Sequence, residues 1–110
     1  MEEFVKGEVL VVPFPFSDLS DSKRRPVLVV ASLGGDDIIL CQITSKNRHD
    51  RYSVELADND FLEGGLKADS FIRPNRIFTA DKSLILYRAG KLKPEKMKEV
   101  EDMLVSIISE

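Results

Sequence analysis

The sequence contains few of the residues that build metal centres or covalent cross-links. Its 110 residues include one histidine, one cysteine and no tryptophan. Metal centres draw on His, Cys, Asp and Glu at characteristic spacings, and the sequence shows no cluster of that kind. We therefore expect neither a metal nor a cofactor. Cys41 lies within an apolar run, so we expect it to be an unreactive thiol in the core.

Long apolar runs and an excess of positive charge are also missing. No stretch approaches the roughly 18 apolar residues that cross a membrane, and no secretion-type segment opens the chain. The composition, 43% apolar and 32% charged, is that of an ordinary globular protein. We expect one domain, residues 1–110, located in the cytoplasm. The formal net charge of −3 argues against coating nucleic acid through overall charge, so such a role requires local clustering of cations.

The hydrophobic pattern predicts five or six short strands followed by one helix. The strand-like stretches are residues 8–14, 27–31, 38–44, 52–56, 69–79 with a bend or bulge at Pro74, and 84–92. The helix is expected to begin at Pro94 and to run for about fourteen residues. Its apolar stripe is Met97, Val100, Leu104 and Ile107/Ile108. Together these elements predict a mainly β fold, a small curled sheet with the C-terminal helix packed on it.

Two loops carry polar and aromatic residues of interest. The segment Pro13-Phe14-Pro15-Phe16 cannot continue a central strand, because two backbone donors are missing. We expect an extended segment there, with Phe14 and Phe16 either packed in the protein or offering a platform for a stacked base. A polar loop should follow over residues 17–25. His49 lies in a second charged loop, and we expect it to be solvated.

A cationic run, Lys23-Arg24-Arg25, leads directly into the apolar strand Val27–Val30. Four apolar residues in succession indicate a strand that is covered on both faces. Pro26 restricts Arg25 to extended geometry, so this guanidinium is fixed at the rim of a rigid element. The alternative is a solvated loop whose three cations simply cap the strand.

The glycine-rich turn at Gly34-Gly35 predicts that strand 27–31 pairs with strand 38–44 as a hairpin. Counting outward from the turn then places Arg25 beside Thr44 at neighbouring strand ends. Ser45 and Lys46 follow Thr44 directly. A guanidinium next to two hydroxyls and an ammonium group is suited to binding phosphate.

Four segments, taken in order, resemble the PemK/MazF family of toxins. They are Gly7-Glu8-Val9 with the Pro-Phe segment, Arg25-Pro26-Val27-Leu28-Val29, Gln42-Ile43-Thr44-Ser45, and residues 69–79. The resemblance implies an SH3-like barrel, a homodimer, and a growth-inhibiting toxin that cuts single-stranded mRNA without a metal or the ribosome. It also implies a small antitoxin whose disordered segment covers the site.

The resemblance also assigns site residues. Arg25 and Thr44 match the family's catalytic arginine and threonine. Family members use the stretches that hold Ser45, Asp69, Ser70, Arg73, Asn75 and Arg76 for substrate contact or site support. Phe16, Lys23, Arg24 and Lys46 complete the expected substrate-binding set. Because the chain is acidic overall, Lys23–Arg25 and the loop with Lys46, Arg48 and Arg51 should jointly form a positive groove, which a dimer could assemble from both protomers.

Two other functions stay open from the sequence. One is a catalytically silent module of the same fold that binds nucleic acid or an antitoxin. The other is a gyrase poison similar to the sibling CcdB family. The resemblance to that family centres on an aromatic-containing C-terminus, whereas this chain has no tryptophan and ends Ser106-Ile107-Ile108-Ser109-Glu110.

Overall fold

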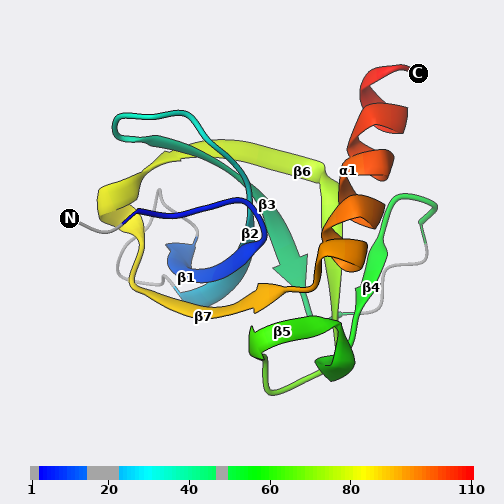
Figure 1. The fold of residues 1–110 in the computed structure, drawn as a ribbon, viewed down its shortest axis with the longest axis horizontal. Coiled ribbons are helices and arrows are strands. Elements are labelled where there is room, and N and C mark those ends of the chain that lie inside the picture. The colour runs from blue at the N-terminus through cyan, green and yellow to red at the C-terminus, as the bar shows by residue number, and fades with distance from the viewer. Residues whose placement is uncertain (1–2, 15–22, 47–49) are drawn as a thin grey trace.

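Seven antiparallel strands form one sheet in the computed structural model, which describes residues 3–14, 23–46 and 50–110 (Figure 1). The strands are β1 (Glu8–Phe14), β2 (Lys23–Ser32), β3 (Asp37–Thr44), β4 (Val54–Leu56), β5 (Phe61–Gly64), β6 (Ser70–Asp81) and β7 (Tyr87–Leu92). Their order across the sheet is β4-β6-β3-β2-β1-β7-β5. Two single 3₁₀ turns, η1 (Asp58–Asp60) and η2 (Lys82–Leu84), and the helix α1 (Pro94–Ile108) complete the described elements.

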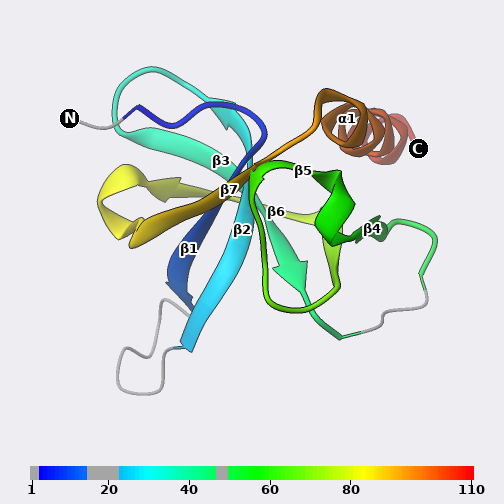
Figure 2. The same ribbon diagram turned by 60° about the horizontal axis from the view of Figure 1, so that its bottom comes forward.

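The sheet curls strongly, which confirms the expected mainly β, barrel-like fold (Figure 2). Its two edge strands, β4 and β5, follow each other in the chain and are joined by η1 alone. The helix α1 lies beside β4 and β6 and covers one face of the curl, as the sequence predicts (Figure 1). None of the described helices is both long and apolar enough to cross a membrane.

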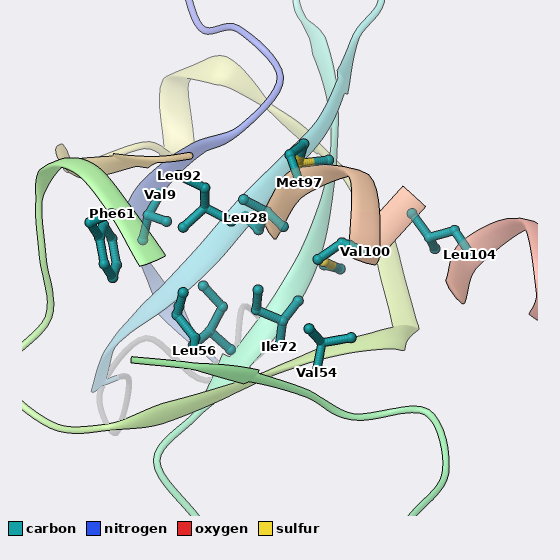
Figure 3. Packing of buried hydrophobic residues seen from close by; sticks show 12 residues of the cluster. Val9, Leu28, Val54, Leu56, Phe61, Ile72, Leu92, Met97, Val100 and Leu104 are labelled. Atoms are coloured by element: carbon teal, nitrogen blue, oxygen red, sulfur yellow. The ribbon is translucent and has the colours of Figure 1, made fainter. Parts of the chain in front are cut away.

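Alternating side chains of the central strands pack on both faces of the sheet. One group, the helix-side cluster, packs under α1 (Figure 3) and contains Val9, Leu28, Cys41, Ile43, Val54, Leu56, Phe61, Ile72, Leu92, Met97, Val100 and Leu104. The other group, the far cluster, contains Phe4, Leu10, Val12, Val27, Val29, Ile38, Leu40 and Ala80. Strand β2 contributes Leu28 to the first and Val27 and Val29 to the second, so the prediction of a strand covered on both faces is confirmed.

Cys41 is fully buried within the helix-side cluster. Loss of hydration on burial raises the pKa of its thiol to about 12, because the interior disfavours the thiolate. The prediction that Cys41 lies in the core is confirmed, and its raised pKa disfavours the thiolate, which is the reactive form.

The polar loop predicted for residues 17–25 ends earlier than expected, because β2 already begins at Lys23. Lys23, Arg24 and Arg25 are the first residues of β2 and pair with Phe14, Pro13 and Val12 of β1. Hydrogen bonding to β1 extends β2 to these three residues. Their charged side chains gave no sign of a strand in the sequence. The pairing of β2 with β3 begins only at Val27, and the pairing of β1 with β7 ends at Val11. Pro13 and Pro26 therefore lie where their strand has a neighbour on one side only, which a proline tolerates.

Two backbone irregularities expected from the sequence are confirmed. Gly34 and Gly35 have φ angles of 68° and 96°, in the left-handed region that glycine tolerates, and they turn β2 into β3. In β6, Arg73 pairs with Gln42 while Ile77 pairs with Cys41, so residues 74–76 form a bulge at Pro74.

The ends of other elements differ from the expectation. The four-residue strand β5 lies in a stretch expected to be a turn-rich connection, and β4 begins only at Val54. Met97, Val100 and Leu104 are buried along α1 as predicted. At the end of the stripe Ile107 is half-buried, whereas Ile108 is 74% exposed, so the predicted stripe ends at Ile107.

The two ends of this stripe allow a test of helix packing. Leu104→Ala is expected to lower the free energy of unfolding by about 2–3 kcal/mol, because it removes a buried side chain and leaves a cavity. Ile108→Ala, the matched control, should change it by less than about 0.5 kcal/mol. Urea unfolding with an unchanged m value would measure both, and equal costs would show that the last helical turn is packed.

Candidate anion-binding site at the ends of β2 and β3

The hairpin register brings Arg25 and Thr44 together. Val27 pairs with Gln42 at the end of the ladder, and Arg25 and Thr44 each lie two residues beyond that pair on their strands. Both side chains line the same two cavities, one on each face of the sheet. The convergence predicted by counting outward from the turn is therefore confirmed.

The first cavity, named the Arg73 cavity, has a volume of about 210 Å³. Arg25, Gln42, Thr44, Lys46 and Arg73 line it on the face shared with Val27. Three of these side chains are cationic, and no described residue that lines the cavity is acidic. A cavity with this lining is complementary to an anion with several oxygen atoms.

Arg73 is held at the wall of this cavity by Asp50. One guanidinium nitrogen, Nη2, lies 3.3 Å from Oδ2 of Asp50. Nε of Arg73 is buried and has no hydrogen-bond partner among the residues that the structure describes. A buried donor without an acceptor is costly, so this nitrogen has an unmet hydrogen-bonding capacity.

Asp50 is well solvated and strongly hydrogen-bonded. The Ser53 hydroxyl donates to Oδ1 of Asp50 at 3.0 Å, and this bond lowers the pKa of Asp50 most. The backbone N–H groups of Ser53 and Tyr52 and the charge of Arg73 act in the same direction. Asp50 is therefore ionised at neutral pH and can orient Arg73.

The hydroxyl of Thr44 is oriented by the chain that follows it. The backbone N–H of Lys46 donates to Oγ1 of Thr44 at 3.1 Å. Because Oγ1 accepts this bond, the hydroxyl proton remains available for a ligand. Arg25 is exposed and forms no ion pair with any described residue, so its charge also remains available.

The second cavity, named the Tyr87 cavity, lies on the other side of the same strand ends. Its volume is about 310 Å³. Its lining residues are Val11, Arg24, Arg25, Pro26, Ile43, Thr44, Ser45, Leu66, Lys67, Ala68, Ser70 and Tyr87. Ser70 is buried there and donates a hydrogen bond to the carbonyl of Ala68 at 2.9 Å. No acidic residue occurs in this set either.

The predicted site residues fall into three groups. Those that line one or both cavities are Arg24, Arg25, Thr44, Ser45, Lys46, Ser70 and Arg73. Lys23, Asp69, Asn75 and Arg76 line neither cavity. Phe16 lies outside the described residues. The roles of all these residues in catalysis or substrate binding stay predictions.

The loop after β3 contributes less charge to the site than expected. Arg51 pairs with Glu110 at 2.9 Å, and its guanidinium lies over the Tyr52 ring, 5.0 Å from the ring centre. Arg51 lines neither cavity, and its place in the expected positive groove stays a prediction. Arg48 and His49 lie outside the described residues.

Three lining residues with polar side chains, Gln42, Lys67 and Tyr87, are absent from the predicted site set. Gln42 lies in the segment Gln42–Ser45, and its pairing with Arg73 gives it a place in the cavity. Lys67 could have been found as a cation shortly before Ser70. No pattern in the sequence around Tyr87 indicates a role in the site, because pairing of β7 with β1 is what brings this residue there.

The fold and the site together define a class, small curled β proteins with a cation-lined site at the ends of their central strands. Within that class, residues 5–108 match the family model described as the PemK-like, MazF-like toxin of type II toxin-antitoxin systems. Because the match covers nearly the whole chain, the protein belongs to this family. A search of curated proteins returned no match.

Solved structures share the fold at low sequence identity. MazF (Form-I) from Deinococcus radiodurans has a TM-score of 0.76 at 18% identity, with 100% of both chains covered. The MazE-MazF complex (Form-III) from the same organism has a TM-score of 0.77 at 18% identity, with 96% of each chain covered. An endoribonuclease from Mycobacterial species has a TM-score of 0.76 at 18% identity, covering 99% of this chain and 94% of that one.

The lowered pKa of Asp50 predicts a pH-dependent contribution to stability. A carboxyl whose pKa falls on folding stabilises the protein above its ordinary value of 3.8, and this contribution is lost as the pH falls through the folded-state pKa. Asp50→Asn should therefore lower the thermal midpoint at pH 7, with the difference from the unaltered protein vanishing in acid. Asp36→Asn, at a carboxylate with no hydrogen bond to the described residues, is the control. A pH-independent difference for Asp50→Asn would contradict the assignment.

Proposed function

We propose that the protein is a toxin that acts as a metal-independent endoribonuclease on single-stranded RNA. The observation that carries the proposal is the convergence of Arg25 and Thr44 on cavities lined by cations, in a chain of net charge −3. Membership of the PemK/MazF-like toxin family supports it. The endoribonucleases among the structures of the same fold support it further.

The proposed reaction uses the substrate's own 2′-hydroxyl as the nucleophile. Its oxygen attacks the adjacent phosphorus, the P–O5′ bond breaks, and the products carry a 2′,3′-cyclic phosphate and a 5′-hydroxyl. Negative charge accumulates on the nonbridging oxygens as the pentacoordinate intermediate forms. Positioned donors at those oxygens lower the barrier, because they stabilise the transition state more than the ground state.

Arg25 and Thr44 are placed to act as these donors. A guanidinium stays charged and donates bidentately to phosphate oxygens, which makes Arg25 a charge stabiliser. Thr44 donates a hydrogen bond from its free hydroxyl to a nonbridging oxygen. The described lining of both cavities has no carboxylate and no imidazole, so the proposal leaves proton transfer to solvent. The need for a 2′-hydroxyl selects RNA over DNA.

The cations near this pair extend the site along the RNA backbone. Lys46 and Arg73 line the Arg73 cavity, and Arg24 and Lys67 line the Tyr87 cavity. Each is suited to a neighbouring phosphate. Ser45 and Ser70 provide hydroxyls between them.

The same surface suggests the partners of the toxin. We propose a cognate antitoxin whose disordered, acidic segment covers the cations, a homodimeric assembly, and a cytoplasmic location. A structure of an endoribonuclease from Mycobacterial species in complex with its cognate antitoxin, at 16% identity and a TM-score of 0.76, supports the antitoxin. A carboxylate-rich segment would neutralise a surface that otherwise holds five cations.

Substitutions at the two central residues test the proposal. Arg25→Ala and Thr44→Val should each slow cleavage of a long unstructured RNA by about 100- to 1000-fold, because each removes a transition-state donor. Thr44→Ser keeps the hydroxyl and should retain the rate within about tenfold. Single-turnover cleavage with antitoxin-free protein measures all three. Failure of the unaltered protein to cut RNA at stoichiometric amounts would refute the enzyme and favour a binding module.

The products and a modified substrate test the proposed chemistry. RNA with 2′-O-methyl riboses should bind and remain intact, because it lacks the attacking hydroxyl. Cleaved RNA should carry 5′-hydroxyl ends, which a polynucleotide kinase phosphorylates without prior phosphatase treatment. Sequencing these ends would also give the cleavage site. Cleavage of the methylated RNA, or 5′-phosphate ends, would contradict attack by the 2′-hydroxyl.

A further inference from the structure

The Tyr87 cavity combines an aromatic ring with an apolar wall. Tyr87 begins β7 and pairs with Val11 of β1, and it stays 49% exposed. Val11, Pro26 and Ile43 of the neighbouring strands, with Leu66, supply the wall. The Arg73 cavity has no aromatic residue among its described lining. The two faces of the site therefore offer different chemistry.

Polar groups surround this apolar part of the cavity. Arg24 and Lys67 are exposed cations, and no described lining residue opposes their charge. Ser70 is buried and donates a hydrogen bond to the Ala68 carbonyl, so its oxygen can still accept a hydrogen bond from a ligand. A flat, partly apolar group with donors on its edge and an anion attached would satisfy all of these residues.

We propose that the Tyr87 cavity binds the nucleobase next to the scissile phosphate, with the Tyr87 ring stacked on the base. The proposal rests on the proposed ribonuclease function and extends it to substrate recognition. Arg25, Thr44 and Ser45 line both cavities, so the two cavities adjoin each other at these residues. A single ligand can therefore extend from one cavity into the other. A nucleotide has this form, because its phosphate is anionic and its base is flat and aromatic.

Ser70 would contribute to the choice of base. Its oxygen, held by the bond to Ala68, accepts from an exocyclic amino group and not from a carbonyl edge. The cavity thus favours a base that presents an amino group toward Ser70. Tyr87 supplies stacking, which tolerates any base.

Tyrosine fluorescence tests the stacking directly. The chain has two tyrosines and no tryptophan, so a Tyr52→Phe variant leaves Tyr87 as its sole strong emitter. A random pool of single-stranded 2′-O-methyl oligonucleotides should quench this emission saturably, after correction for absorbed light. Inorganic polyphosphate, which has charge but no base, should not. Quenching by both, or oligonucleotide binding without quenching, would overturn the proposal.

A substitution series tests the role of the ring. Tyr87→Ala and Tyr87→Leu should weaken binding of the 2′-O-methyl pool by about 5- to 100-fold, and Tyr87→Phe by less than about twofold. Leu86→Ala is the matched control, because Leu86 is 48% exposed and lines neither cavity. Wild-type affinity in Tyr87→Leu would exclude stacking. An altered solution mass in Tyr87→Ala would assign the residue to assembly and overturn the proposal.

The cleavage pattern separates this proposal from the function on which it rests. Tyr87→Ala should flatten the base preference at one position beside the cut, whereas Leu86→Ala should leave the pattern unchanged. If the unaltered protein cuts no RNA yet shows base-dependent quenching, the ribonuclease function fails and the base-binding cavity stands. If RNA is cut and Tyr87→Ala keeps the same affinity and pattern, the cavity assignment fails and the ribonuclease stands.

Discussion

The antiparallel register between β2 and β3 is the constraint on which the site depends. A turn at Gly34 and Gly35 sets that register, and the pairing of Val27 with Gln42 carries it to the far end of the hairpin. A slip of one residue would send Arg25 or Thr44 to the opposite face of the sheet. The two apolar clusters oppose such a slip, because it would exchange Leu28 of one cluster with Val27 and Val29 of the other and disrupt the packing of both. Core packing and site geometry therefore have a common cause.

Charge is distributed very unevenly in this acidic chain. Most acidic side chains lie elsewhere, and many of them pair with cations, as Glu101 does with Lys6 and Asp102 with Lys98. The five cations of the two cavities have one described acidic partner between them, Asp50, which holds Arg73. Crowded cations repel one another, so the folded protein carries an electrostatic cost that a polyanion would relieve. The charge of this lining is complementary to that of a ligand with several negative charges.

Much of the fold was predictable from local pattern, and so was the centre of the site. The Gly34–Gly35 turn, the bulge at Pro74 and the start of α1 each follow from residues whose backbone preferences are strong. Arg25 and Thr44 could be predicted to lie close together, because counting residues outward from the turn of a hairpin shows which residues of its two strands are neighbours. The Tyr87 cavity could not be anticipated, since it depends on how β7 pairs with β1 and on where residues 66–68 lie. The pairing of Arg51 with Glu110 could not be anticipated either, because the two residues are 59 positions apart in the sequence.

The buried thiol of Cys41 lies on β3, three residues before Thr44, in a chain with no other sulfhydryl group. An alkylating reagent can reach it only when β3 separates from its neighbours. The rate of alkylation in native buffer is therefore a readout of how often the central hairpin opens, without any introduced label. Ligands that bridge β2 and β3 would slow the alkylation of Cys41. The alkylation rate would therefore report how much of the protein has a ligand bound at these strand ends.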